Sequence, residues 1–323
     1  MGKRKIRHPT INQKNKMENK IIIGIDLGGT KIMVGAVTLS GNVIGEPIKV
    51  LTVGSDPSDK IISRITSAVD DLLIQLNFSI HNVIGIGIGS TGPLNIEKGI
   101  ILECPQLPSM NFFPLKNTFE KHYGVPVYIN NDANCLIYAE VMFGVAKNKN
   151  NIVGFTLGTG IGCAIILNHK ILNGTNGAAG EVWPSPYKSG SIEDFVSGKG
   201  VSKIYKKISG KDASSRNILS LAENGDNDAI DTWREFGKHL AIPIAWSINL
   251  LDPEMIVLGG SISKAHTFFM PTLEENVFNK ICNEPAKKIK ITISELGDYA
   301  GFIGATCLVL AENALHEIET VNK

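Results

Sequence analysis

The sequence predicts an α/β fold made of two similar domains, and three observations support this. Apolar runs with strand character alternate with runs of helical periodicity, an order that favours largely parallel sheets. An apolar run that breaks into a Gly/Thr turn occurs at residues 23–31 and again at 154–160. A second pair of similar strands, each ending in glycine and serine, lies at 83–90 and 255–261. Two motifs that recur in the same order indicate a duplicated domain, in which ligands bind at the carboxyl ends of the strands.

Composition and length are those of an ordinary globular protein. The chain has 323 residues, of which 43% are hydrophobic and 20% charged, with a net charge of +1. This length suits two domains, and the net charge gives no drive toward nucleic acid or a membrane surface. No apolar stretch approaches the roughly 20 residues that cross a bilayer, and residues 1–20 contain no apolar run of the kind found in a signal peptide. We therefore expect a cytoplasmic protein that binds neither nucleic acid nor membrane.

Cysteines and the basic start of the chain carry no catalytic signal. The cysteines are scattered without C-x-x-C spacing, which favours reduced thiols over a metal cage; they are Cys104, Cys135, Cys163, Cys282 and Cys307.

Residues 1–19 are rich in lysine and arginine and lack apolar periodicity. They are predicted to be a disordered tail, with a basic nucleic-acid arm as the alternative.

The expected first domain comprises residues 20–130, joined by a C-terminal helix at about 301–318. Its helix from residue 56 onward is predicted from apolar residues at i, i+3 and i+4 spacing, among them Ile61, Ile65, Val69 and Leu72. The expected elements in order are a strand at 21–26, a hairpin through 32–50, that helix, a strand at 82–88, a helix at about 114–123 and a strand at 125–129.

The expected second domain comprises residues 131–300 and repeats this scheme. Its elements are a helix at 131–144, a hairpin at 151–172, helices around 199–209, 215–224 and 226–251, and a strand at 255–258 that ends in a glycine break. The last apolar helix, at about 301–315, is expected to pack on the first domain.

The two Gly/Thr turns suit phosphate binding. Glycine has no Cβ and lets backbone N–H groups approach phosphate oxygens closely, and the hydroxyls of Thr30 and Thr159 could add to this ring of donors. Asp26 ends the first strand, where Mg²⁺ would need a carboxylate. The alternative is a pair of ordinary hairpins whose glycines serve turn geometry alone.

Asp132 is the candidate general base. It lies just inside a predicted helix N-terminus, where the partial positive charge of the helix favours an ionised carboxylate. Such a carboxylate can accept the proton of a substrate hydroxyl within hydrogen-bond reach. Residues Asn130, Asn131 and Asp132 also suit a helix cap, and the two roles are compatible.

Six motifs taken together resemble the ROK family (repressor, open reading frame, kinase) of the actin/hexokinase/Hsp70 fold. The resemblance covers residues 20–315 and implies two actin-like, ribonuclease H-like domains with a ligand cleft between them. Its motifs are Asp26–Lys31, Gly87–Leu94, Asn131–Asn134, Leu157–Gly162, Gly177–Glu181 and Leu258–Gly260.

The resemblance implies an ATP-dependent kinase that phosphorylates a hexose, glucose or an N-acetylhexosamine, at the 6-hydroxyl. It implies Asp132 as general base, with ATP and Mg²⁺ as cofactors and a homodimer as the assembly. The sugar-binding residues that it implies are Asn131, Gly92, Glu181 and Glu193. The expected nucleotide-binding residues are Asp26, Gly28, Gly29, Thr30, Lys31, Gly158, Thr159, Gly160, Gly162, Gly259 and Gly260.

The chain departs from the family pattern after Glu181. Most relatives have a histidine three positions after this glutamate, followed by a cluster of cysteines. The histidine and the cysteines together hold a structural zinc. Here Pro184 stands at that position and no cysteine lies between Glu181 and Glu193, so we expect no zinc site. Trp183 could stack on the apolar face of the sugar, but a wedge that packs against the domain is the preferred interpretation.

Two other functions remain open at this point. The family includes sugar-sensing repressors, which carry a winged helix-turn-helix of roughly 60–80 residues in front of the sugar-binding body. The segment before the first strand is too short for one, so we expect a kinase. The second alternative is a scaffold that has lost its catalytic activity, and the presence of Asp132 and both turns argues against it.

The sequence does not identify the sugar or the phosphoryl donor. The candidate sugars are glucose, N-acetylglucosamine, mannose, N-acetylmannosamine and fructose, and the candidate donors are ATP, ADP and polyphosphate.

Overall fold

The computed structural model describes residues 19–321, with side chains described up to residue 313. The predicted basic tail therefore lies outside the described residues, apart from Asn19. The chain divides into two compact units. The first unit ends at Asn130 and resumes at Ala305, and the second comprises Asn131–Gly304. Each unit has its own five-stranded sheet and its own hydrophobic core.

The sheet of the first unit has the strand order β3-β2-β1-β4-β7. Strand β2 is antiparallel to both β1 and β3, whereas β1 and β4 are parallel. Nearly every residue of β1 and β4 is buried, as expected for strands that are covered on both faces. The strand bounds are β1 Ile21–Leu27, β2 Lys31–Thr38, β3 Val43–Leu51, β4 Val83–Ser90 and β7 Val127–Asn131.

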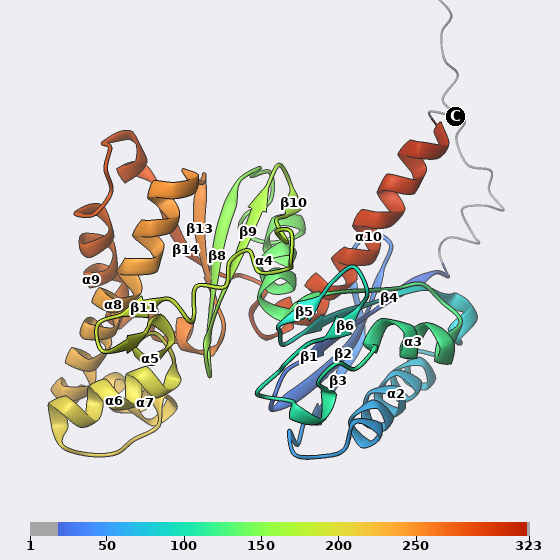
Figure 1. The fold of residues 1–323 in the computed structure, drawn as a ribbon, viewed down its shortest axis with the longest axis horizontal. Helices are drawn as coiled ribbons and strands as arrows, with labels where there is room; N and C mark the ends of the chain where they lie inside the picture. Colours follow the sequence, from blue (N-terminus) through green and yellow to red (C-terminus); the bar gives the residue numbers. More distant parts are fainter. Residues whose placement is uncertain (1–18, 322–323) are drawn as a thin grey trace, which may run out of the picture. The chain divides into compact units, whose positions relative to one another are not determined.

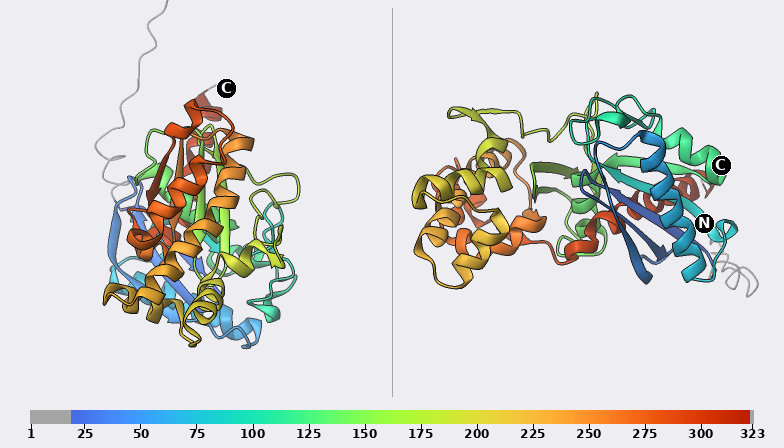
Figure 2. Two further views of the ribbon diagram at one scale, coloured as in Figure 1. Left: turned by 90° about the vertical axis from the view of Figure 1, so that its left-hand side faces the viewer. Right: turned by 90° about the horizontal axis from the view of Figure 1, so that it is seen from below.

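Helices cover this sheet. Helix α2 (Ser58–Gln75) buries the apolar face predicted from its periodicity, including Ile61, Ile65 and Leu72, and runs along the sheet (Figure 2). Helix α10 (Ala300–Val321) lies against β4, where its Ala305 meets Gly87. The smaller elements are α3 (Leu115–Tyr123), β5 (Leu94–Asn95), β6 (Ile100–Ile101) and the 3-10 turns η1 (Ile80–Asn82) and η2 (Pro108–Met110).

The sheet of the second unit has the equivalent order, β10-β9-β8-β13-β14. Again the second strand in this order, β9, is antiparallel to both of its neighbours, β10 and β8, and β8, β13 and β14 are parallel. The shared order confirms the predicted duplicated α/β fold. The bounds are β8 Ile152–Leu157, β9 Ile161–Leu167, β10 Lys170–Ile171, β13 Met255–Gly259 and β14 Lys290–Ile293.

The second unit has a large aromatic and aliphatic core beneath its helices. Trp233, Phe236 and Phe269 are fully buried in it, with Phe236 and Phe269 edge to face at a centroid distance of 5.5 Å. The long helices α8 and α9 lie side by side (Figure 1). Its remaining elements are α4 (Asp132–Met142), β11 (Pro186–Tyr187), β12 (Gly190–Ser191), α5 (Ile192–Phe195), α6 (Gly198–Ser209), α7 (Ser215–Glu223), α8 (Asn227–Leu251), η3 (Ser261–Ala265), α9 (His266–Phe278), η4 (Pro285–Lys288) and η5 (Gly297–Tyr299).

Several of the short elements were not predicted, and neither were helix α9 and strand β14 of the second unit. Helix α9 was not predicted, since it contains Pro271 and has aromatic residues on more than one face, which weakens its helical periodicity. Strand β14 was not predicted either, because it has only four residues. Among the described helices, none is long and apolar enough to cross a membrane.

Candidate active site

The first Gly/Thr turn closes on itself at the end of β1. Gly28 N–H donates to the carbonyl of Lys31 at 3.1 Å, and Thr52 N–H donates to the carbonyl of Thr30 at 3.0 Å. Thr30 and Lys31 are exposed, and Asp26 is half-buried. Asp26 pairs with Gly89 of the parallel strand β4. The carboxylate therefore lies at the carboxyl edge of the sheet, where α/β proteins bind ligands.

The segment around Gly92 lies beside this first turn. Thr91 N–H donates to the carbonyl of Leu27 at 3.1 Å, and the Thr91 hydroxyl donates to Gln106 Oε1 at 2.5 Å. Gln106 in turn packs on Gly29. The first unit thus brings Gly92 together with the turn at Gly28–Lys31. Gln106 was missed by the sequence analysis, because it stands in an irregular segment without a motif.

The second turn is closed in a similar way at the end of β8. Gly158 N–H donates to the carbonyl of Gly160 at 3.0 Å, and Thr159 is exposed. The carbonyl of Gly158 accepts the N–H of Gly198 at 2.8 Å, which places the start of α6 against the turn. A helix N-terminus carries partial positive charge and binds anions. Gly198 was missed, although the cap residue Ser197 in front of it is a recognisable helix start.

The predicted glycine break after β13 lies next to this second turn. Gly259 of β13 pairs in parallel with Thr156 of β8, so Gly259 and Gly260 lie at the carboxyl end of the neighbouring strand. The second unit therefore brings the predicted nucleotide-binding residues of both motifs to one edge of its sheet.

Asp132 is the first residue of α4, and its neighbours fix its position. Asn131 is the cap residue, and its side chain accepts the N–H of Ala133 at 2.9 Å. Asp132 accepts the same N–H at 2.7 Å. A Cβ at Gly162 would lie 2.6 Å from the Cβ of Ala133, so glycine is required there for α4 to approach β9. Gly162 therefore holds the start of α4 close to the strand that leaves the second turn.

Burial opposes the ionised carboxylate that was expected for Asp132 from its place at the helix N-terminus. Burial raises the pKa of Asp132, and the backbone N–H groups of Ala133 and of Asp132 itself oppose that rise. A carboxylate with a raised pKa holds a transferred proton more firmly.

Glu181 is electrostatically coupled to Asp132. Burial raises the pKa of Glu181, the Trp183 indole N–H lowers it, and the negative charge of Asp132 raises it again. The Trp183 N–H donates to Glu181 Oε2 at 2.5 Å. Trp183 is 40% exposed, so more than half of its surface is covered while part of the ring faces solvent. Its packing as a wedge against the domain stays a prediction.

Glu193 connects the second turn to the Glu181 segment. Its Oε2 accepts the N–H of Ile161 at 3.2 Å, and a Cβ at Gly160 would lie 2.2 Å from the same oxygen. Its backbone N–H donates to the carbonyl of Trp183 at 3.2 Å. The second unit thus brings together Asp132, Glu181, Glu193 and the turn.

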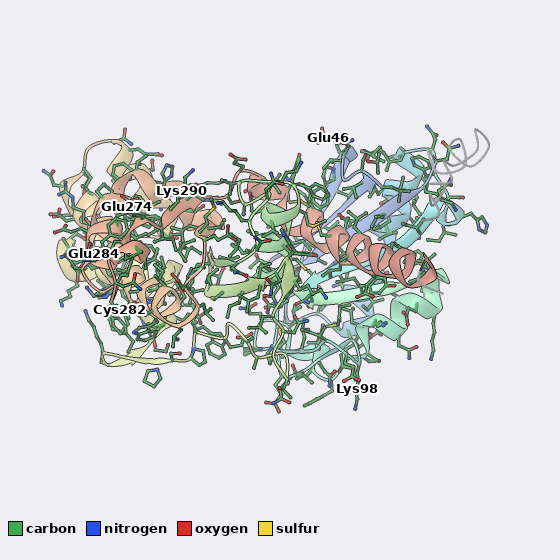
Figure 3. The ribbon with its side chains drawn as sticks, turned by 90° about the horizontal axis from the view of Figure 1, so that it is seen from above. Glu46, Lys98, Glu274, Cys282, Glu284 and Lys290 are labelled. Atoms are coloured by element: carbon green, nitrogen blue, oxygen red, sulfur yellow. The ribbon has the colours of Figure 1, made fainter. Side chains whose placement is uncertain are left out.

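The described part of the chain also contains cysteines and a cavity that the predicted site does not use. No three His, Cys, Asp or Glu side chains among the described residues are grouped to hold a metal ion. Cys163 is buried, which raises the pKa of its thiol to about 12. Cys282 is exposed and lies near Glu284 (Figure 3). A cavity of about 1020 Å³ next to α6, α8 and α9 includes none of the predicted site residues.

The fold and these clustered residues define a duplicated α/β protein with glycine turns at the strand ends of both units. The chain belongs to the ROK family, whose pattern it matches over residues 22–312.

Relatives with two kinds of activity resemble the chain. It is 28% identical over 318 residues to a glucokinase of Halalkalibacterium halodurans, covering 91% of this chain and 96% of that protein. It is 26% identical over 329 residues to a xylose repressor of Caldicellulosiruptor bescii, covering 95% of this chain and 82% of that one. Among solved structures, the ROK family glucokinase from Streptomyces griseus in complex with glucose and AMPPNP superposes with a TM-score of 0.78 at 25% identity, covering 89% of this chain and 98% of that one.

Proposed function

We propose that the protein is an ATP-dependent sugar kinase that transfers the γ-phosphoryl group of ATP to the 6-hydroxyl of a hexose. The observation that carries the proposal is the placement of Asp132 at the start of α4, where the next residue, Ala133, packs on Gly162 of β9 and the charge of Asp132 acts on Glu181. The glucokinase relatives, which match nearly the whole chain, favour the same activity.

Asp132 is proposed as the general base. Its carboxylate takes the proton of the sugar hydroxyl as that oxygen bonds to the γ-phosphorus, and the bond between this phosphorus and the β–γ bridging oxygen breaks to release ADP. The raised pKa of Asp132 favours acceptance of the proton. General base catalysis of this kind contributes about 10²–10⁴-fold to a rate.

The two glycine turns and the start of α6 are proposed to bind the phosphates of ATP. Their backbone N–H groups and the exposed threonines supply donors without bulk. Asp26 fits a magnesium ion that enters with the nucleotide, because Mg²⁺ needs only one or two carboxylates beside phosphate oxygens and water. When bound, this ion neutralises charge on the transferred phosphate.

The sugar is proposed to bind through Asn131, Gly92, Glu181 and Glu193. Carboxylates suit hydroxyl groups because each oxygen accepts two donors. Glu193 uses Oε2 for the N–H of Ile161, so its Oε1 would receive the sugar. Glucose and the N-acetylhexosamines are the preferred substrates, with mannose and fructose as further candidates.

The experiment that tests this proposal measures ADP release from Mg-ATP with glucose, N-acetylglucosamine, mannose, N-acetylmannosamine and fructose supplied one at a time. We expect turnover with one or two of these sugars and none without sugar. No turnover with any of them would contradict the hexose kinase.

A sugar-sensing regulator is the second candidate, because a xylose repressor matches 95% of this chain. Such a protein would bind a sugar and release no ADP, so calorimetric sugar binding without turnover would favour it. The homodimer remains a prediction from the family resemblance, and light scattering of the purified protein would measure it.

A further inference from the structure

We propose that Trp183 is a sugar-binding residue that acts in two ways: its indole N–H holds Glu181 in position, and its exposed ring packs against the carbon skeleton of the sugar. This inference rests on the proposed function. It deepens that function by naming a residue that determines sugar affinity and specificity.

The first argument is the placement of the Trp183 backbone. Its carbonyl accepts the N–H of Glu193 at 3.2 Å. Two residues later, the carbonyl of Ser185 accepts the N–H of Ile192 at 3.0 Å. The short hairpin formed by β11 and β12 lies within the loop that these two contacts close. The backbone at Trp183 is therefore fixed beside Glu193, and its side chain is presented from a well-defined point.

The second argument is the use of the indole N–H. It donates to Glu181 Oε2 at 2.5 Å, so Trp183 contacts the Glu181 carboxylate through its side chain and the Glu193 backbone through its carbonyl. A partly buried carboxylate near the negative charge of Asp132 needs donors to remain ionised. The indole supplies one donor to Oε2, and a sugar hydroxyl can supply the next to Oε1.

The third argument is the exposure of the ring. Trp183 is 40% exposed although its polar edge is hydrogen-bonded, so what it presents to solvent is mainly apolar. A hydroxyl that donates to Glu181 would place its sugar ring next to this indole. An apolar face beside hydroxyl-binding carboxylates is the combination that a pyranose requires, since its C–H groups and its hydroxyls point in different directions.

The test separates the two roles with two variants. Trp183→Phe keeps an aromatic ring and removes the N–H, whereas Trp183→Gln keeps an N–H donor and removes the ring. Trp246→Phe is the matched control, because Trp246 is also 40% exposed but lies on α8. Sugar affinity is measured by calorimetry with the same five sugars, and KM and kcat are measured for sugar and for ATP.

We expect Trp183→Phe to weaken sugar binding about 10- to 100-fold, as for the loss of a hydrogen bond to a carboxylate. Trp183→Gln should weaken it about tenfold through lost apolar contact. In both variants the KM for ATP stays within about twofold of the wild-type value. Trp183→Phe should also move the acid limb of sugar binding to higher pH, because the N–H that lowers the pKa of Glu181 is gone. Trp183→Gln should leave that limb in place.

Wild-type sugar affinity in Trp183→Phe would overturn the positioning role, and wild-type affinity in Trp183→Gln would overturn the ring contact. An equal rise in the KM values for sugar and ATP, with a lower melting temperature, would make Trp183 a structural residue and overturn both. If the wild-type protein binds none of the sugars, the proposed function itself fails, which is a separate result.

Discussion

Replacement of Glu140 by glutamine should destabilise the second unit by about 3 kcal/mol. Glu140 is fully buried on α4, the helix that begins with Asp132. Its Oε1 accepts the Ser294 hydroxyl at 2.5 Å and the N–H of Leu296 at 2.9 Å. Its Oε2 accepts the N–H of Val145 at 2.9 Å. One carboxylate therefore ties the end of α4 to the segment that follows β14.

The magnitude follows from the number of acceptor atoms. Glutamine has a single acceptor oxygen, and when that oxygen faces Ser294 and Leu296 its NH₂ group meets the N–H of Val145. One hydrogen bond to a charged group, worth about 1.5–3 kcal/mol, is lost and a buried donor is left unpaired at about 1–3 kcal/mol. The two contributions overlap, which gives about 3 kcal/mol and a melting temperature lower by about 6–12 °C.

Thermal and urea unfolding of the wild-type and variant proteins measure this change. Glu284→Gln is the control, because Glu284 is 84% exposed, pairs only with Lys287 in the described part of the chain, and lies at the periphery of the second unit (Figure 3). Its loss should cost less than about 1 kcal/mol. Equal melting temperatures for the two variants would refute the assignment of Glu140 as the buried anchor of α4.

Two further predictions concern the second turn and the response to pH. Gly160→Ala places a methyl group 2.2 Å from Glu193 Oε2, so we expect this carboxylate to lose its hydrogen bond with the N–H of Ile161. The KM values for sugar and ATP should then rise about tenfold. Steady-state kinetics with both KM values unchanged would contradict a role of the Glu193–Ile161 contact in binding. Burial, and next the charge of Lys188, lowers the pKa of His239 to about 4. Over this pH range His239 therefore binds a proton in the unfolded chain but not in the folded protein. The free energy of unfolding should fall by at most about 3 kcal/mol as the pH drops from about 6.5 to 4. In His239→Gln, melting temperatures across this range should lose that slope, and a slope equal to the wild-type one would exclude His239 as its source.

The duplicated fold could be predicted because its signals are local. Helix α2 buries a face with regular spacing, and β1 and β4 are mainly apolar runs that break at Gly28 and at Gly89 and Ser90 respectively. Helix α9 and strand β14 could not be predicted, because tertiary packing determines them more than local pattern does. Phe269 of α9, for example, is fixed by its contacts with Trp233 and Phe236 of α8.

The candidate site, too, could be predicted only in part from the sequence. Asp132 follows from the polar run at the start of a helix, and the two turns follow from their glycines. The roles of Gln106 and Gly198 depend on contacts between distant segments, with Gly29 and Gly158 respectively. Trp183 makes a hydrogen bond to Glu181, which no spacing in the sequence reveals.

The proposed role of Asp132 is tested most directly with Asp132→Asn, which keeps the shape of the side chain and removes its ability to take up a proton. The rate of sugar 6-phosphate formation from Mg-ATP and the Kd for the sugar are measured on the same preparation. We predict that kcat falls by about 10²–10⁴-fold while the sugar Kd changes by less than about threefold. A variant that phosphorylates the sugar at the wild-type rate would contradict Asp132 as the general base and, with it, the proposed mechanism.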